Sequence, residues 1–99
     1  MKRKNSNKAQ AWFLYLMECT DGSIYTGITV DVADRYRAHA NGKGARYTRS
    51  HPPARLLAAI GYPDRSSASR AEYKVKTLSP NEKRAYALTL VLGKIASED

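Results

Sequence analysis

Five polar residues in this chain have side chains of the kinds that hydrolytic enzymes use. Arg35 and His39 are four residues apart, so on a helix they share one face and can reach a common ligand. Tyr15 and Tyr25 lie in two stretches rich in apolar and β-branched residues, and Glu72 lies in a later, charged stretch. Each also has an ordinary structural explanation, because strand tyrosines usually pack half-buried and helical charges usually face water. Only their combination indicates a site.

Gly27 lies two residues beyond Tyr25, on the same side of an extended strand. A glycine there leaves space where a side chain would otherwise stand. We therefore interpret Gly27 as a structural residue of the same site.

A second group of residues suits contact with nucleic acid. Lys43, Arg46 and Arg49 can bind phosphate oxygens, and Tyr47 among them can stack on an unpaired base. Lys74 is a further candidate of the same kind. The alternative is an ordinary solvated loop that carries no binding function.

The overall charge favours a polyanionic partner. The 99 residues contain 17 Lys and Arg against 9 Asp and Glu, a net charge of +8. Positive charge is concentrated in residues 1–11 and again in residues 31–56. Such a balance attracts nucleic acid and speeds encounter with it, although a similar charge also keeps small domains soluble.

The lone cysteine, Cys19, limits the setting and the chemistry. One cysteine forms neither an internal disulfide nor a zinc ribbon, which favours a reducing, intracellular environment. Nothing around Cys19 indicates a nucleophile, and His51, which precedes two prolines, is expected to have no chemical role.

The longest apolar run, 12–17, is far shorter than the roughly 20 residues of a membrane helix, and no signal-peptide pattern is present, so we expect a cytoplasmic protein.

The elements that must position these residues follow from hydrophobic pattern, turn residues and cap residues, with Asp31 capping the first helix and Ser79-Pro80-Asn81-Glu82 forming a capping box at the start of the last. We predict strands over 12–18 and 24–29, a helix over 32–41, a loop over 42–53, a strand over 55–62, and helices over 66–78 and from 80 to about 92. This order, β-β-α-β-α-α, indicates an α/β (α+β) fold: a small central antiparallel sheet of about three strands flanked by helices. Residues 12–92 would form one domain, preceded by a flexible basic arm (1–11) and followed by a tail (93–99).

The first two strands form a hairpin whose register decides whether the tyrosines can act together. A two-residue turn at Asp21-Gly22 would pair Tyr15 with Ile28 and send Tyr15 and Tyr25 to opposite faces of the sheet. An odd loop or a bulge would place Tyr15, Tyr25 and Gly27 on one face. Because shared chemistry requires one face, we predict that the turn is not the simple two-residue type.

In order and spacing, the chain resembles the GIY-YIG nucleases, in particular small single-domain bacterial members similar to the nuclease module of Slx-type structure-specific endonucleases. The resemblance covers about residues 12–78, and it is carried by Leu14-Tyr15-Leu16, Tyr25-Thr26-Gly27, Thr29-Val30-Asp31, Arg35-Tyr36-Arg37-Ala38-His39, Asn41-Gly42, Gly44-Ala45-Arg46-Tyr47-Thr48-Arg49 and Ala71-Glu72. The first tripeptide keeps only its tyrosine, and the second has Thr26 in its middle position. The zinc domain of the Slx-type enzymes has no counterpart, since the chain has one cysteine.

The resemblance implies a metal-dependent endonuclease that hydrolyses DNA, with selectivity for DNA structure and a role in repair or processing. Glu72 would hold one divalent ion, Mg²⁺ or Mn²⁺, and Arg35 would hold the scissile phosphate. Tyr15 or Tyr25 would be the base, with His39 relaying or positioning the proton; the sequence does not divide these roles.

Other readings remain open at this stage. The chain could be a nucleic-acid-binding protein with a vestigial nuclease site, or a ribosome-associated basic protein. RNA is a possible substrate, and a protein partner could supply specificity.

Overall fold

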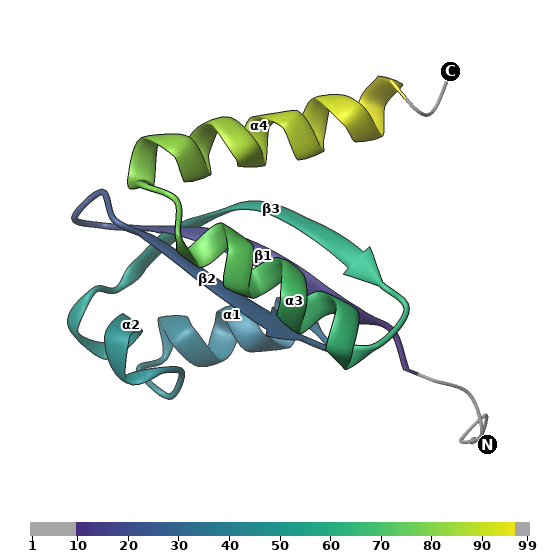
Figure 1. Cartoon of the computed structure of the whole chain (residues 1–99). Coiled ribbons are helices and arrows are strands. Elements are labelled where there is room, and N and C mark those ends of the chain that lie inside the picture. Colours follow the sequence, from purple (N-terminus) through teal and green to yellow (C-terminus); the bar gives the residue numbers. More distant parts are fainter. Residues whose placement is uncertain (1–9, 97–99) are drawn as a thin grey trace.

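The computed structural model describes residues 10–96, and it confirms an α+β fold built on one small sheet (Figure 1). The elements in chain order are β1 (Trp12–Cys19), β2 (Ile24–Thr29), α1 (Val32–Ala40), α2 (Arg46–Ser50), β3 (Pro53–Tyr62), α3 (Arg65–Lys76) and α4 (Pro80–Ala96). No helix in this part of the chain is long and apolar enough to cross a membrane.

The sheet has the order β2-β1-β3, and both neighbouring pairs are antiparallel. The central strand β1 is covered on both faces, since four consecutive residues, Leu14 to Met17, are all buried. Alternate side chains of a strand point to opposite faces, so each face of β1 must have its own cover. The sheet is therefore the middle layer between helices.

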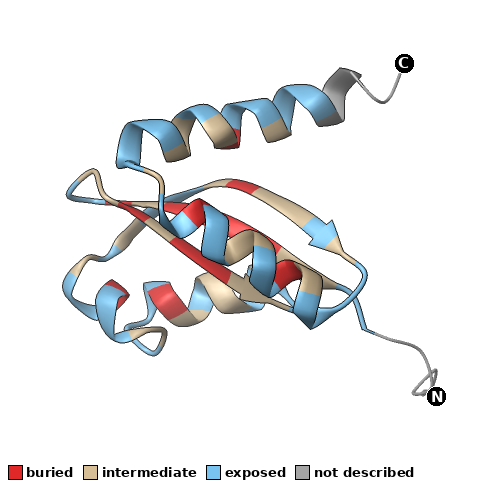
Figure 2. Cartoon of the chain, in the orientation of Figure 1, coloured by how far each residue is buried: buried red, intermediate tan, exposed pale blue. Residues whose placement is uncertain are grey.

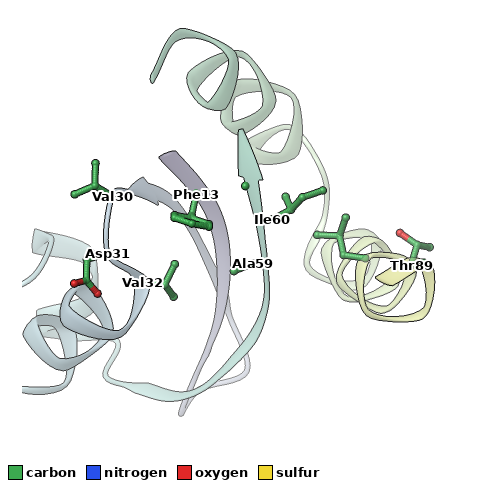
Figure 3. Close-up of a pocket in the computed structure, with 10 residues that line it drawn as sticks. Phe13, Val30, Asp31, Val32, Ala59, Ile60 and Thr89 are labelled. Atoms are coloured by element: carbon green, nitrogen blue, oxygen red, sulfur yellow. The ribbon is translucent and has the colours of Figure 1, made fainter. Parts of the chain in front are cut away.

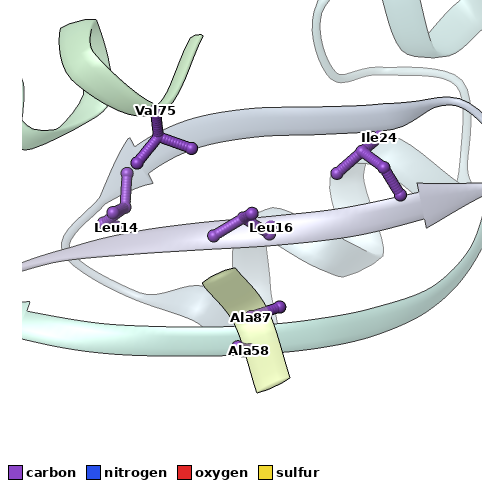
Figure 4. Close-up of a cluster of buried hydrophobic side chains, with 6 residues drawn as sticks. All are labelled: Leu14, Leu16, Ile24, Ala58, Val75 and Ala87. Carbon is purple, nitrogen blue, oxygen red and sulfur yellow. The ribbon is translucent and has the colours of Figure 1, made fainter. Parts of the chain in front are cut away.

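One face of the sheet carries the hydrophobic core. Leu14, Leu16 and Ile24 pack there with Val75 of α3 and Ala87 of α4 (Figure 4). Buried segments concentrate in the middle of the strands and on the helix faces turned toward them, while the outward helix faces are exposed (Figure 2). The helices α3 and α4 therefore pack on the core face of the sheet, and α1 and α2 lie on the other face of β1.

The β1–β2 turn confirms the predicted register. The Gly22 N–H donates to the Cys19 carbonyl (2.9 Å), and the Cys19 N–H donates to the Ser23 carbonyl (2.8 Å). Gly22 has a φ of +87°, a conformation open to glycine at little cost, so the loop has three residues, 20–22. Tyr15 consequently lies opposite Gly27, on the same face as Tyr25.

Side-chain caps stand at the start of two helices, as the sequence predicts. The Asp31 carboxylate accepts from the Asp34 N–H at the start of α1. At the start of α4, the Ser79 hydroxyl accepts from the Glu82 N–H, while the Glu82 carboxylate accepts from the Ser79 N–H. This reciprocal pair is the capping box that the sequence indicates.

The ends of β1, α1 and α3 differ from the sequence-based expectation by one or two residues, and three further differences bear on the description of the fold. The predicted loop 42–53 contains the short helix α2, and β3 begins at Pro53 rather than at residue 55. The helix α4 continues to Ala96, so the start of the predicted 93–99 tail is helical. Residues 1–9 of the predicted arm and residues 97–99 lie outside the described residues.

Candidate active site

Tyr15 is the residue around which the predicted site gathers. Its side chain is 2% exposed and lies over Gly27 of the neighbouring strand. A Cβ atom at position 27 would stand 2.6 Å from the Tyr15 hydroxyl oxygen, closer than real Cβ contacts come. Only glycine therefore fits beneath the hydroxyl group.

His39 of α1 contacts Tyr15 through a hydrogen bond. Its Nε2 is 2.8 Å from the Tyr15 hydroxyl oxygen, and its Nδ1 is 2.7 Å from the hydroxyl oxygen of Thr48. The imidazole is buried, and the backbone of Gly44 lies so close that any Cβ there would overlap the ring. The ring is thus held on both of its nitrogens and by a neighbouring backbone.

Tyr25 completes an aromatic cluster with these two residues. Its ring centroid is 5.0 Å from that of His39, in an edge-to-face arrangement, and 6.2 Å from that of Tyr15. Tyr25 is half-buried, so it lies between the enclosed Tyr15–His39 pair and the surface. Rings at these distances fix one another's orientation.

Arg35 and Glu72, the two charged members of the predicted set, both influence the pKa of Tyr15. Burial raises the pKa of Tyr15 to about 12, with further increases from Tyr25 and Glu72 that a hydrogen bond from Arg35 and its positive charge partly offset. Arg35 comes from α1 and Glu72 from α3, so charges from elements distant in the sequence act on Tyr15. The structure brings together all five of the residues predicted to do chemistry.

The ionisation states in this cluster follow from its burial. Tyr15 remains a neutral phenol at physiological pH, because its pKa is about 12. Burial lowers the pKa of His39, and the nearby Arg35 charge lowers it further, so the imidazole is held neutral. A neutral phenol hydrogen-bonded to a neutral imidazole is a pair through which a proton can pass.

Glu72 is the acidic group available to a metal ion in this cluster. The described residues contain no group of three or more His, Cys, Asp or Glu side chains placed to hold an ion. A single hard carboxylate nevertheless fits Mg²⁺, which keeps several waters and commonly takes its other ligands from substrate phosphates. Glu72 also pairs with Lys76 at 3.2 Å, one helical turn along α3.

The predicted nucleic-acid contacts divide between two places. Lys43, Arg46 and Arg49 are exposed around α2, next to the aromatic cluster, whereas Lys74 is exposed on α3. Tyr47 is 39% exposed, and its ring stacks with those of Tyr25 and His51, at centroid distances of 6.0 Å and 4.0 Å. Part of the ring surface is therefore already covered within the fold.

Sequence reasoning missed three residues that support this site. Thr48 and Gly44 contact the His39 ring, and both lie in the segment 44–49 whose similarity to the nuclease family was the available signal. His51 stacks on Tyr47 with ring centroids 4.0 Å apart, and its Nδ1 is 2.5 Å from the Asp21 carboxylate. No sequence signal connects His51 to Asp21, which lies 30 residues earlier.

An apolar groove of about 740 Å³ lies away from this cluster, between the start of α1, the strand β3 and the helix α4 (Figure 3). Phe13, Val30, Ile60 and Leu90 are among its lining residues. Its carboxylate, Asp31, is engaged in capping α1. None of the residues predicted for chemistry or nucleic-acid binding lines it, so we place the candidate site at Tyr15 instead.

Comparison with known proteins agrees with this arrangement. Residues 11–85 match the model of the GIY-YIG catalytic domain. A UPF0213 protein of Cupriavidus necator is 52% identical over 80 residues, which cover 81% of this chain and 87% of that protein. A UPF0213 protein of Xanthomonas axonopodis pv. citri is 53% identical over 75 residues, covering 76% of this chain and 74% of that protein.

A solved structure is also similar to the chain. The solution NMR structure of the UPF0213 protein BH0048 from Bacillus halodurans is 47% identical, covers 77% of this chain and 81% of its own, and has a TM-score of 0.48. The match to the catalytic-domain model extends from the start of β1 into α4 and includes Tyr15, Tyr25, Arg35, His39 and Glu72. The chain belongs to the GIY-YIG catalytic domain family.

Proposed function

We propose that the chain is a metal-dependent endonuclease that hydrolyses phosphodiester bonds in DNA. The observation that carries this proposal is the hydrogen bond between the Tyr15 phenol and the His39 imidazole, with the Arg35 guanidinium and the Glu72 carboxylate close enough to act on the pKa of Tyr15. GIY-YIG catalytic domains are typical of endonucleases, and the net charge of +8 suits a polyanionic substrate.

Arg35 would bind the scissile phosphate. A guanidinium matches two phosphate oxygens at once and keeps its charge at any physiological pH. Because Arg35 is close enough to Tyr15 to act on its pKa, the phosphate would lie next to the group that handles the proton. Charge that develops on the phosphoryl oxygens would be stabilised by the same guanidinium.

Tyr15 and His39 form the proton-transfer pair of this proposal. Burial keeps Tyr15 from existing as a free phenolate, so it can take a proton from water only while its own proton moves to a neighbour. His39, at 2.8 Å, is that neighbour. Tyr25, which is more accessible, would orient the water and the substrate.

Glu72 would hold one divalent ion, Mg²⁺ or Mn²⁺, with the substrate phosphate as a further ligand. When bound, such an ion supplies positive charge to the phosphoryl and departing oxygens. Lys76 pairs with the Glu72 carboxylate and would have to release it when the ion binds.

We propose branched or otherwise distorted DNA, as met in repair or processing, as the substrate. The basic side chains around α2 suit backbone contacts, which follow the shape of a nucleic acid rather than its sequence. A domain this small has little further surface for reading bases, so shape is the more accessible signal.

A substrate panel tests the proposal. Purified protein is incubated with labelled duplex, flap, single-stranded and RNA substrates in Mg²⁺, Mn²⁺ or EDTA. We expect cleavage of the flap substrate with either metal and none in EDTA. Cleavage of RNA alone would show that the substrate is RNA and would contradict the proposal of a DNA endonuclease. Binding without cleavage of any substrate would leave a nucleic-acid-binding protein with a vestigial site.

A further inference from the structure

Thr48 lies at the buried end of a row of hydrogen bonds that begins at Tyr15. Its hydroxyl oxygen is 2.7 Å from His39 Nδ1 and 3.0 Å from the carbonyl oxygen of Ala45. The His39 Nε2 is in turn 2.8 Å from the Tyr15 hydroxyl oxygen. Exposure of the three side chains is between 1% and 2%, so water does not compete for these hydrogen bonds.

The Ala45 carbonyl at the buried end sets the direction of every hydrogen bond in the row. The Ala45 carbonyl can only accept, so the single proton of the Thr48 hydroxyl points to it, and His39 Nδ1 must donate to Thr48. A neutral imidazole carries a single N–H, so His39 Nε2 must then accept from the Tyr15 hydroxyl. The phenolic proton therefore points to His39 Nε2.

The reversed direction leaves one bad contact. The oxygen atoms of Thr48 and Ala45 would face each other at 3.0 Å with no proton between them. A buried acceptor pair without a proton between its members destabilises the folded state, so the first direction is preferred.

We propose that Thr48 is a positioning residue that holds neutral His39 in the tautomer with its proton on Nδ1, so that Nε2 is a bare acceptor for the Tyr15 proton. The surrounding backbone serves the same end. The five-residue helix α2 carries Thr48, and the backbone of Gly44 lies against the ring that Thr48 orients.

This tautomer defines a balanced proton path for the proposed hydrolysis. As the water oxygen bonds to phosphorus, its proton passes to the Tyr15 oxygen and the phenolic proton passes to His39 Nε2. Tyr15 stays neutral and His39 becomes an imidazolium that still donates from Nδ1 to Thr48. The departing oxygen takes a proton from solvent, and His39 later returns its proton to solvent.

The tautomer can be read by nitrogen-15 NMR of the imidazole ring in the full chain at pH 8, without any substrate. The chain has two histidines, and a His51→Gln variant assigns the signals of His39. We expect a protonated, pyrrole-type Nδ1 and an unprotonated, pyridine-type Nε2 in the wild-type protein. A protonated Nε2 with a bare Nδ1 would overturn the proposal.

Two substitutions separate positioning from mere packing. Thr48→Ser keeps the hydroxyl group and should keep both the tautomer and the cleavage rate. Thr48→Val keeps the shape but removes the acceptor, so the ring should populate the other tautomer. We expect kcat to fall by about 10- to 10⁴-fold, with the KM for DNA little changed.

The kinetic part rests on the proposed function, whereas the NMR part does not. An inactive wild-type protein with the expected tautomer would count against the nuclease and support the assignment of Thr48. A folded Thr48→Val protein with an unchanged tautomer would overturn that assignment, whatever its activity. If the valine variant does not fold, Thr48→Ala gives the same readout.

Discussion

Buried threonine hydroxyls have opposite surroundings on the two faces of the sheet. Thr48 donates to a carbonyl and lies 2.7 Å from His39, whereas the Thr26 hydroxyl has no hydrogen-bond partner among residues 10–96. Thr26 pairs with Leu16 on the face that carries the core. A buried hydroxyl without a partner destabilises the folded state, because it loses its hydrogen bonds to water.

Thr26→Val should therefore stabilise the protein. Valine has nearly the same shape, and its methyl group has no need of a hydrogen bond, so we expect the free energy of unfolding to rise by about 1 kcal/mol. Urea denaturation measures the change. Thr29→Val on the same strand is the matched control and should lower stability, because the Thr29 hydroxyl accepts from the Asp31 N–H. A loss of stability in Thr26→Val would contradict this account of the core.

The elements show where sequence patterns are informative and where they are not. Hydrophobic pattern and cap residues predicted the three strands and the helices α1, α3 and α4, because those signals act over a few neighbouring residues. The helix α2 was missed because its five residues carry little helix propensity of their own. The contact between Thr48 of α2 and His39 forms only in the folded chain, so the sequence gives no local sign of it. Local pattern also ended α4 early, at 92 rather than Ala96.

The residues of the candidate site and the register of its two tyrosines could be predicted from the sequence, whereas the contacts that enclose the site could not. The Asp21-Gly22 pair favours a two-residue turn, and the requirement that the tyrosines share a face was what favoured the register that the structure has. The partners that enclose the site, Thr48 and Gly44, act through contacts with His39 across 9 and 5 positions of the chain. Spacing alone does not reveal such contacts.

The hairpin turn should show a specific pH dependence. A hydrogen bond from Ser23, followed by the contact with His51, holds the pKa of Asp21 well below its usual range. A carboxyl group with a lowered pKa stabilises the folded state above its unfolded pKa, near 3.8, and loses that contribution as the pH falls through its folded pKa.

Asp21→Asn should accordingly lower stability at pH 6, and the gap to wild type should close as the pH falls below about 4. Denaturation curves at several pH values measure it. Asp34→Asn is the control, because the Asp34–Arg37 ion pair is highly exposed and such pairs contribute little. A gap that stays constant from pH 6 to pH 2 would show that Asp21 does not act through its charge.

The whole molecule presents its two kinds of surface on different sides. The clustered positive side chains Lys43, Arg46 and Arg49 lie beside the aromatic cluster, at the end of β1 where the hairpin turns. The apolar groove lies between β3, α4 and the start of α1 (Figure 3). A nucleic acid drawn to the positive side would meet the candidate site directly.

Replacing Lys43, Arg46 or Arg49 singly by alanine should weaken DNA binding on every sequence. Each lost phosphate contact lowers the slope of log K against log salt by about one, because fewer counterions are released. Binding titrations at several salt concentrations measure the slope. Arg65→Ala is the matched control, since this guanidinium lies over Trp12 at the other end of β1. Unchanged slopes in all three variants would place the DNA surface elsewhere.

The most direct test of the nuclease is the effect of removing the Glu72 carboxylate on cleavage and on binding, measured side by side. In Mg²⁺, the wild type and an Asp34→Ala control should cut a labelled flap DNA, while Glu72→Ala should not. Binding of the same DNA by Glu72→Ala should be unchanged or tighter, because a negative charge near the phosphates is gone. Wild-type cleavage by Glu72→Ala, or by the wild type in EDTA, would contradict a metal-dependent site at Glu72.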